Sequence, residues 1–136
     1  MAGDEVIQFS QQVQFGYLAT TGPDRGPRVR PVGIKDVYGD DVCFFTFANT
    51  RKVAEIAADP RVEVVWAKEE ELSQVRIVGV AEAVDDPAAQ QRFREDNPSV
   101  GQILPLGADH LFLLYKIKPQ GVYAAPGLVP YTQVPW

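Results

Sequence analysis

The chain has 136 residues, of which 46% are hydrophobic and 23% are charged. This balance is typical of one globular domain, here expected over residues 1–136, and excludes a disordered tail or a fibre. The formal net charge of −5 excludes a general nucleic-acid binder, which needs surplus Lys and Arg. The single cysteine, Cys43, excludes an intrachain disulfide. No signal peptide or membrane-spanning apolar stretch is evident, so we expect a cytoplasmic protein without a membrane partner.

The first half of the chain is expected to form one helix followed by three strands. Val6, Phe9 and Val13 recur at helical spacing, which predicts an amphipathic helix within residues 3–14. Strands are expected over residues 15–21, 28–37 and 42–47, separated by the turn-rich segments 22–27 and 38–41.

The second half is expected to alternate helical and extended segments. Val53, Ile56 and Ala57 predict a helix that ends at Asp59 and Pro60. Further strands are expected over residues 61–68, 73–84, 111–117, 121–125 and 129–134. A short helix with Asp86 as its N-cap and a second helical segment beginning at residue 98 are also expected. Six to eight strands, mostly joined by hairpin-length links, predict a mainly β fold: an antiparallel barrel with peripheral helices.

Several common catalytic motifs are absent from the sequence. It contains neither the Gly-x-Gly-x-x-Gly nor the Walker A pattern of nucleotide-binding loops. One histidine and one cysteine, far apart, do not form a metal site, so no metal is expected. His110 and the three serines lie in no nucleophile-elbow context. We therefore set nucleophilic catalysis aside.

Positive charge is concentrated between residues 25 and 52, a segment that contains six basic residues and three acidic ones. The remainder of the chain carries seven basic and fifteen acidic residues. A small positive region in an acidic protein favours one compact anion over a long polyanion. Chance clustering on solvated strands explains the charge equally well.

Arg51 and Lys52 lie in the first turn of the helix expected after Thr50. Cations there oppose the helix dipole, at a cost of about 0.3–1 kcal/mol each. Free backbone N–H groups, the Thr50 hydroxyl and the two cations could converge on one phosphate. The alternative is that both cations are simply solvated. Arg28 and Arg30 share one face of the expected second strand, which is either an exposed face or an anion clamp.

Four segments, residues 30–35, 45–46, 50–52 and 74–82, carry a resemblance to a known family. In order and spacing they are similar to the flavin-binding pattern of the pyridoxamine 5′-phosphate oxidase-like family. The resemblance extends from about Val13 to Val84. Residues 97–99 and the short C-terminal hairpin resemble a compact branch that includes nitroimidazole-reductase-like proteins. The resemblance implies an FMN-binding split-barrel fold with FMN as the cofactor.

The resemblance also implies cofactor-binding roles by position. The Arg-x4-Lys element and the aromatic-Thr pair contact or line the flavin, and the Thr-Arg-Lys element holds its phosphate. A glutamine on the following long strand also touches FMN. The residues that match these elements are Arg30, Lys35, Phe45, Thr46, Thr50, Arg51, Lys52 and Gln74. No catalytic side chain is assigned, because the flavin itself performs the electron transfer.

The family resemblance further implies a homodimer with its flavin sites between the subunits. The oxidase itself has a C-terminal Arg-x-His substrate element, which this sequence lacks, and this disfavours pyridoxamine phosphate as the substrate. The expected function is therefore an FMN-dependent oxidoreductase acting on an unidentified small molecule. The alternatives are a non-enzymatic electron carrier or redox sensor, and a split barrel that holds a deazaflavin or haem.

Overall fold

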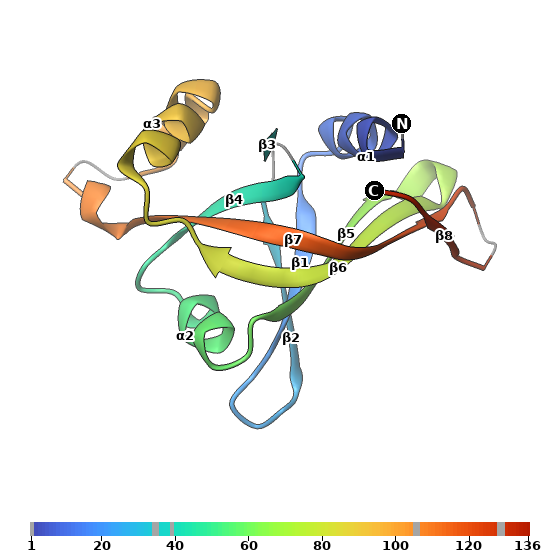
Figure 1. Ribbon diagram of the computed structural model, residues 1–136, viewed down its shortest axis with the longest axis horizontal. Helices are drawn as coiled ribbons and strands as arrows, with labels where there is room; N and C mark the ends of the chain where they lie inside the picture. The colour runs from blue at the N-terminus through green and yellow to red at the C-terminus, as the bar shows by residue number, and fades with distance from the viewer. Residues whose placement is uncertain (1, 34–35, 39, 105–106, 128–129) are drawn as a thin grey trace.

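One antiparallel sheet dominates the computed structural model, which describes residues 2–33, 36–38, 40–104, 107–127 and 130–136 (Figure 1). Its strands are β1 (Gly16–Thr21), β2 (Pro27–Val32), β3 (Asp36–Tyr38), β4 (Asp41–Phe47), β5 (Arg61–Lys68), β6 (Ser73–Ala83), β7 (Phe112–Ala125) and β8 (Thr132–Val134). They follow the order β2-β1-β5-β6-β7-β4-β3, and β8 pairs with β7. The predicted mainly β fold is confirmed.

The sheet curls into a split barrel. Strands β2 and β3 form its two opposite edges, yet only three residues separate Val32 from Asp36. Four chain steps span at most about 14 Å, so the two edges lie close together. Alternate side chains of the strands fill the interior, where Leu18, Phe44 and Ile77 are fully buried.

The described helices are α1 (Ala2–Gln11), α2 (Arg51–Ala58), α3 (Pro87–Asp96) and α4 (Ser99–Ile103). Figure 1 shows α2 below the sheet and α3 above the sheet, at the left of the view. The expected cap of α3 is confirmed, because the Asp86 side chain accepts a hydrogen bond from the Ala88 amide at 3.0 Å. No described helix has both the length and the apolar character needed to cross a membrane.

Two predicted strand boundaries are wrong. The single strand expected over residues 28–37 is two strands, because the chain leaves β1 at one edge of the sheet and joins β4 at the other. The separate strands expected over 111–117 and 121–125 form one strand, β7. Its pairing with β6 passes from Pro119 to Gly121 and skips Gln120. Pro119 and Gly121 therefore mark a β-bulge within one strand and not a turn between two strands.

Gly79 lies opposite this bulge and provides a test of it. A Cβ at this position would overlap the backbone oxygen of Lys118 and lie 2.8 Å from Cγ2 of Ile117. We expect Gly79→Ala to lower the free energy of unfolding by about 1–3 kcal/mol, measured by urea denaturation. Gly101→Ala on α4 is the control, because the space around it is empty and alanine favours a helix. A Gly79→Ala variant as stable as the wild type would contradict the close approach.

Candidate functional site

A buried ion pair joins helix α2 to strands β1 and β2. Arg30 on β2 donates hydrogen bonds to Oε1 of Glu55 at 2.6 Å and to Oγ1 of Thr20 at 2.7 Å. Thr20 on β1 donates to the same carboxylate oxygen at 2.9 Å. The side chain of Glu55 is only 4% exposed and that of Arg30 is 21% exposed. The three residues therefore fix the helix against the two strands.

A second set of polar contacts connects the end of β4 to the start of α2. The hydroxyl oxygens of Thr46 and Thr50 are 3.3 Å apart, and Nζ of Lys52 lies 3.3 Å from Oγ1 of Thr50. Lys52 also interacts electrostatically with Arg30 and Glu55, so the two sets form one group. We call this group, which consists of Thr20, Arg30, Thr46, Thr50, Lys52 and Glu55, the α2 cluster.

The start of helix α2 has no side-chain cap from its own N-cap residue. Thr50 is that residue, with extended backbone (φ −96°, ψ 154°). Its hydroxyl donates to the Phe47 carbonyl at 2.7 Å and makes no capping hydrogen bond. The first turn contains Arg51 and Lys52 but no acidic residue. A helix start with uncapped N–H groups and two cations attracts an anion.

Positive charge exceeds negative charge around this helix start. Arg30, Arg51 and Lys52 surround a single carboxylate, that of Glu55. Burial and the nearby charge of Arg30 lower the pKa of Lys52, and Glu55 opposes this only in part. Burial raises the pKa of Glu55, but hydrogen bonds from Thr20 and Arg30 and the neighbouring cations lower it overall. The excess of positive charge matches the charge of a phosphate dianion.

The structure brings together Arg30, Thr46, Thr50 and Lys52 from the predicted cofactor-binding set. Arg51 lies on the same helical turn but is exposed, and it lines a neighbouring pocket of about 370 Å³ beside the β1–β2 loop. Arg28 pairs with Asp24 at 2.9 Å instead of joining the cluster. Lys35 lies outside the described residues.

Phe45 and Gln74 lie away from the α2 cluster. Phe45 is on the opposite face of β4 from Thr46 and stacks on Phe112, with ring centroids 6.0 Å apart. Gln74 on β6 accepts a hydrogen bond from the Tyr131 hydroxyl at 3.0 Å and lines a pocket of about 470 Å³ near α1 and β8. No member of the α2 cluster is among the described residues that line the pockets of Phe45 and Gln74. The predicted set is therefore divided between different surfaces of one chain.

Sequence reasoning missed Thr20 and Glu55. The helical pattern placed Ala57 on the buried face of α2, but Ala57 is exposed and Glu55 is buried. A carboxylate is buried there because Arg30 and Thr20 satisfy it. The only available signal was an acidic residue one helical turn after two cations.

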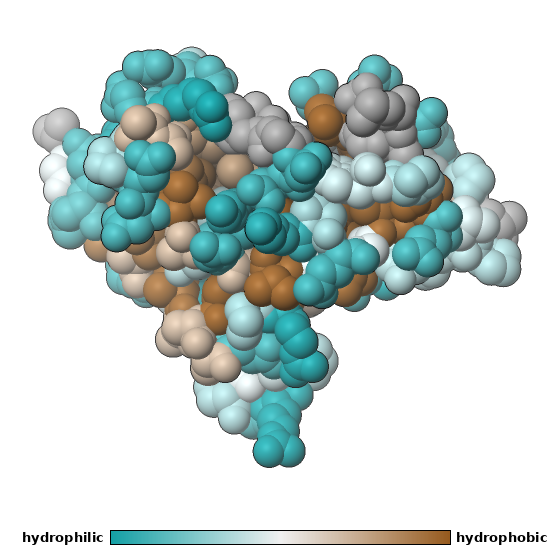
Figure 2. Space-filling model, in the orientation of Figure 1, coloured by the Kyte–Doolittle hydropathy of each residue, from teal (hydrophilic) through white to brown (hydrophobic). Residues whose placement is uncertain are grey.

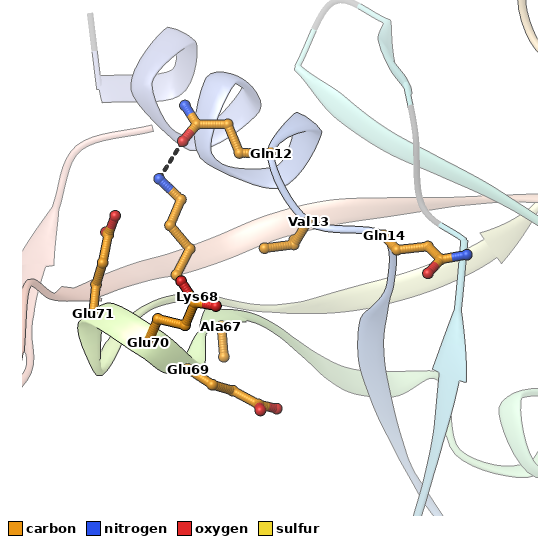
Figure 3. A pocket seen from close by; sticks show the side chains of 8 residues that line it. All are labelled: Gln12, Val13, Gln14, Ala67, Lys68, Glu69, Glu70 and Glu71. Atoms are coloured by element: carbon orange, nitrogen blue, oxygen red, sulfur yellow. Dashed lines mark hydrogen bonds between the residues drawn. The ribbon is translucent and has the colours of Figure 1, made fainter.

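A pocket of about 510 Å³ lies elsewhere, between the end of α1 and the turn after β5 (Figure 3). Glu69–Glu71 line it, and Lys68 donates to the side-chain oxygen of Gln12. These acidic surroundings disfavour an anionic cofactor. Within the part of the chain that the structure describes, no group of three His, Cys, Asp or Glu residues could hold a metal ion.

Comparison with known proteins places this chain in a family. The family model for pyridoxamine 5′-phosphate oxidase matches residues 2–124. The chain belongs to the pyridoxamine 5′-phosphate oxidase family. A pyridoxine/pyridoxamine 5′-phosphate oxidase of Nostoc punctiforme is 39% identical over 84 residues, which are 60% of this chain and 38% of the relative. The matched segment thus spans well under half of that curated relative.

Solved structures of the same fold cover nearly the whole chain. A nimc/nima family protein from Clostridium acetobutylicum has a TM-score of 0.81 at 18% identity, covering 98% of this chain and 94% of that one. A heme binding protein from Mycobacterium smegmatis has a TM-score of 0.77 at 20% identity, covering 98% of this chain and 57% of that one. At these identities the likeness shows the fold alone, and it confirms the predicted split barrel.

The buried carboxylate of Glu55 should make the stability of the protein depend on pH. Its folded-state pKa lies below the ordinary value of 4.5, so its contribution to stability is full above that pH and is lost as pH falls through the folded pKa. At pH 7, Glu55→Gln should lower the free energy of unfolding by about 1–3 kcal/mol. The difference from wild type should shrink as the pH falls from about 5 to about 3.

Urea denaturation over this pH range measures the effect. Glu82→Gln is the matched control, because Glu82 is exposed at the end of β6 and should contribute little at any pH. Equal stability of Glu55→Gln and wild type at pH 7 would contradict the account of the ion pair.

Proposed function

We propose that the protein binds FMN through the α2 cluster and Arg51 and uses it as an oxidoreductase acting on a small molecule. The observation that carries this proposal is the surplus positive charge at the uncapped start of α2. Membership of the pyridoxamine 5′-phosphate oxidase family supports a flavin in this fold. The phosphate of FMN supplies the anion that the helix start lacks.

The charged residues around the start of α2 have different parts in binding. Lys52 and Arg51 supply charge-assisted hydrogen bonds to phosphate oxygens, and the first-turn amides of α2 add backbone donors. Glu55 and Thr20 hold the Arg30 guanidinium in place, so its charge acts on the site without side-chain motion. When bound, the flavin supplies the hydride or electron transfer. The protein binds and orients it, and we assign no acid or base among the side chains.

We also propose a homodimer that uses the outer face of β1, β2, β5 and β6. Val29 is 69% exposed and Tyr17 is 42% exposed on this face. Arg76 on β6 has a buried Nε with no hydrogen-bond partner among the described residues. Gln74 lies two residues along β6, on the same face as Arg76. A second copy seated here would cover the apolar surface and bring Gln74 toward the partner's cofactor.

Haem is the competing cofactor, raised by the heme binding protein of the same fold. The only histidine, His110, is exposed on the short helical turn Asp109–Leu111. The α2 cluster contains no His, Cys, Met or Tyr, the usual axial ligands of haem iron, so its hydroxyls and cations suit a phosphate better than the iron. The absorption spectrum of the purified protein distinguishes the two cofactors, because haem gives a Soret band. A steady-state assay with reduced nicotinamide then separates an enzyme from an electron carrier.

Replacing both Arg51 and Lys52 by Ala tests the phosphate site. Charge-assisted hydrogen bonds contribute roughly 1.5–3 kcal/mol each, so FMN affinity should fall by about one to several orders of magnitude. Riboflavin has the same ring without the phosphate, so its affinity should change much less. Fluorescence titration of each ligand against wild type and variant measures both effects.

The control for this experiment removes the same charge elsewhere. Arg92→Ala combined with Lys116→Ala, on α3 and β7, should leave FMN affinity within about twofold of wild type. An equal loss of FMN and riboflavin in the Arg51 and Lys52 variant would show that these residues support the fold or the ring pocket. No loss of either ligand would show that they are solvated cations.

The dimer is tested by placing a charge on the apolar face. Wild type should have a light-scattering mass of about twice 15.0 kDa, and Val29→Asp should shift it toward the monomer because the charge would be buried at the interface. Val29→Thr, which keeps the branched shape without charge, should remain dimeric. FMN affinity should fall with dissociation, since the cofactor site lies between subunits. A monomeric wild type that binds FMN tightly would contradict the interface site.

A further inference from the structure

A pocket of about 370 Å³ lies between the β1–β2 loop and helix α2. Pro23 and Arg25 of the loop line one side of it, and Arg51, Ala54 and Ala58 of α2 line the other. These α2 positions are three and four residues apart, so they belong to one face of the helix. Figure 2 shows weakly hydrophobic side chains over α2 and hydrophilic ones over the loop at the foot of the view. The pocket therefore combines two guanidinium groups with an apolar surface.

The described acidic side chains around this pocket are paired with arginines that do not line it. One carboxylate is in the β1–β2 loop, and the other two line the pocket from α2 and from the residue after it. Hydrogen bonds from Arg61 lower the pKa of Asp59 to about 2, so this carboxylate is ionised at neutral pH. The pairs are Asp24 with Arg28 at 2.9 Å, Glu55 with Arg30 at 2.6 Å and Asp59 with Arg61 at 2.7 Å.

Arg25 and Arg51 are the two arginines that this pairing leaves over. Both are exposed, and neither makes an ion pair or a side-chain hydrogen bond with a described residue. Five arginines against three carboxylates leave two positive charges, and both of these charges line the pocket. A guanidinium group binds carboxylate and phosphate oxygens through paired N–H donors. The pocket therefore attracts an oxyanion.

Hydrogen bonds within the β1–β2 loop hold the backbone of Arg25 in place. Arg25 has a φ of 64°, in the left-handed region that few residues with a side chain adopt. Its amide donates to the Gly22 carbonyl at 3.0 Å, and the Gly22 amide donates to the Gly26 carbonyl at 2.7 Å. The Gly26 amide in turn donates to Oδ1 of Asp24 at 3.0 Å. The loop is thus ordered without a ligand, which lowers the entropic cost of binding one.

We infer that this pocket is a second anion site beside the α2 cluster and that it binds a small organic dianion with an apolar body. Two guanidinium groups without partners match two negative charges, and the apolar body would cover Pro23, Ala54 and Ala58. A phosphate monoester and a dicarboxylate both have this chemistry. Lys52 and Thr50 are not among the described residues that line the pocket, which distinguishes it from the proposed site of the cofactor phosphate.

Arg51 connects this second site to the cofactor. In the proposed function Arg51 also binds the phosphate of FMN, so FMN and an anion in the pocket compete for one guanidinium group. Each ligand should therefore weaken the binding of the other by the same factor. This coupling rests on the proposed FMN function, whereas the second site itself depends on Arg25 and does not require FMN.

Calorimetric titration at pH 7.5 with four probes that share a benzene ring tests the charge of the ligand. Phenyl phosphate and phthalate are dianions, benzoate is a monoanion and benzyl alcohol is neutral. We expect the tighter dianion to bind at least about tenfold more tightly than benzoate, and benzyl alcohol to bind most weakly. The comparison of phenyl phosphate with phthalate distinguishes a phosphate monoester from a dicarboxylate as the preferred group.

Substitutions on both sides of the pocket test its location. Arg25→Gln should weaken binding of the dianion by about tenfold and leave FMN affinity within about twofold of wild type, since Arg25 lies outside the α2 cluster. Ala58→Phe, which fills the pocket from an exposed position on α2, should weaken the dianion by about fivefold or more. Lys118→Ala is the matched control, because it removes one positive charge from an exposed residue of β7 outside the pocket. It should leave the affinity unchanged.

The titrations are run with and without FMN so that the two proposals fail separately. With FMN bound, the dianion should still bind, about two- to fivefold more weakly. A dianion that binds only without FMN and does not respond to Arg25→Gln occupies the cofactor phosphate site, and this result would overturn the second site. Equal affinities for the dianions and benzyl alcohol would overturn it as well. A protein that binds no FMN but loses dianion affinity in Arg25→Gln would overturn the proposed function and support the second site.

Discussion

The ion pair between Arg30 and Glu55 is the interaction on which the candidate site depends. It joins strand β2 to helix α2 at 2.6 Å, and Thr20 of β1 bonds to the same carboxylate oxygen. A buried carboxylate without these partners would be costly, so the helix has one favourable position against the strands. That position sets the start of α2 beside Thr46 at the end of β4. The fold thereby fixes a helix start, two hydroxyls and the cations in one place.

The pair leaves a charge imbalance that the rest of the acidic chain does not share. One carboxylate is satisfied by Arg30, while Lys52 and the exposed Arg51 remain beside it. Across β4, the described residues that line the pocket of Phe45 and Phe93 carry no charged side chain.

Local patterns in the sequence predicted most elements, and non-local pairing explains the failures. Strand β5 and the cap at Asp86 followed from alternation and capping chemistry. The division between β2 and β3, and the bulge that makes β7 continuous, depend on which distant strands pair, and periodicity does not encode this. The candidate site shows the same difference between residues predicted from local patterns and residues that depend on distant partners. The residues around Thr50 came from one short motif, whereas the burial of Glu55 required a partner twenty-five residues earlier.

Phosphorus NMR of FMN bound to the protein tests the central claim most directly, because it observes the anion itself. A phosphate monoester has its second ionisation near pH 6, and surrounding cations stabilise the dianion. The account predicts a resonance displaced from that of free FMN and constant in position between about pH 5 and pH 8. A resonance that titrates near pH 6 as it does for free FMN would show that the phosphate remains in solvent. That result would contradict a phosphate site at the start of α2.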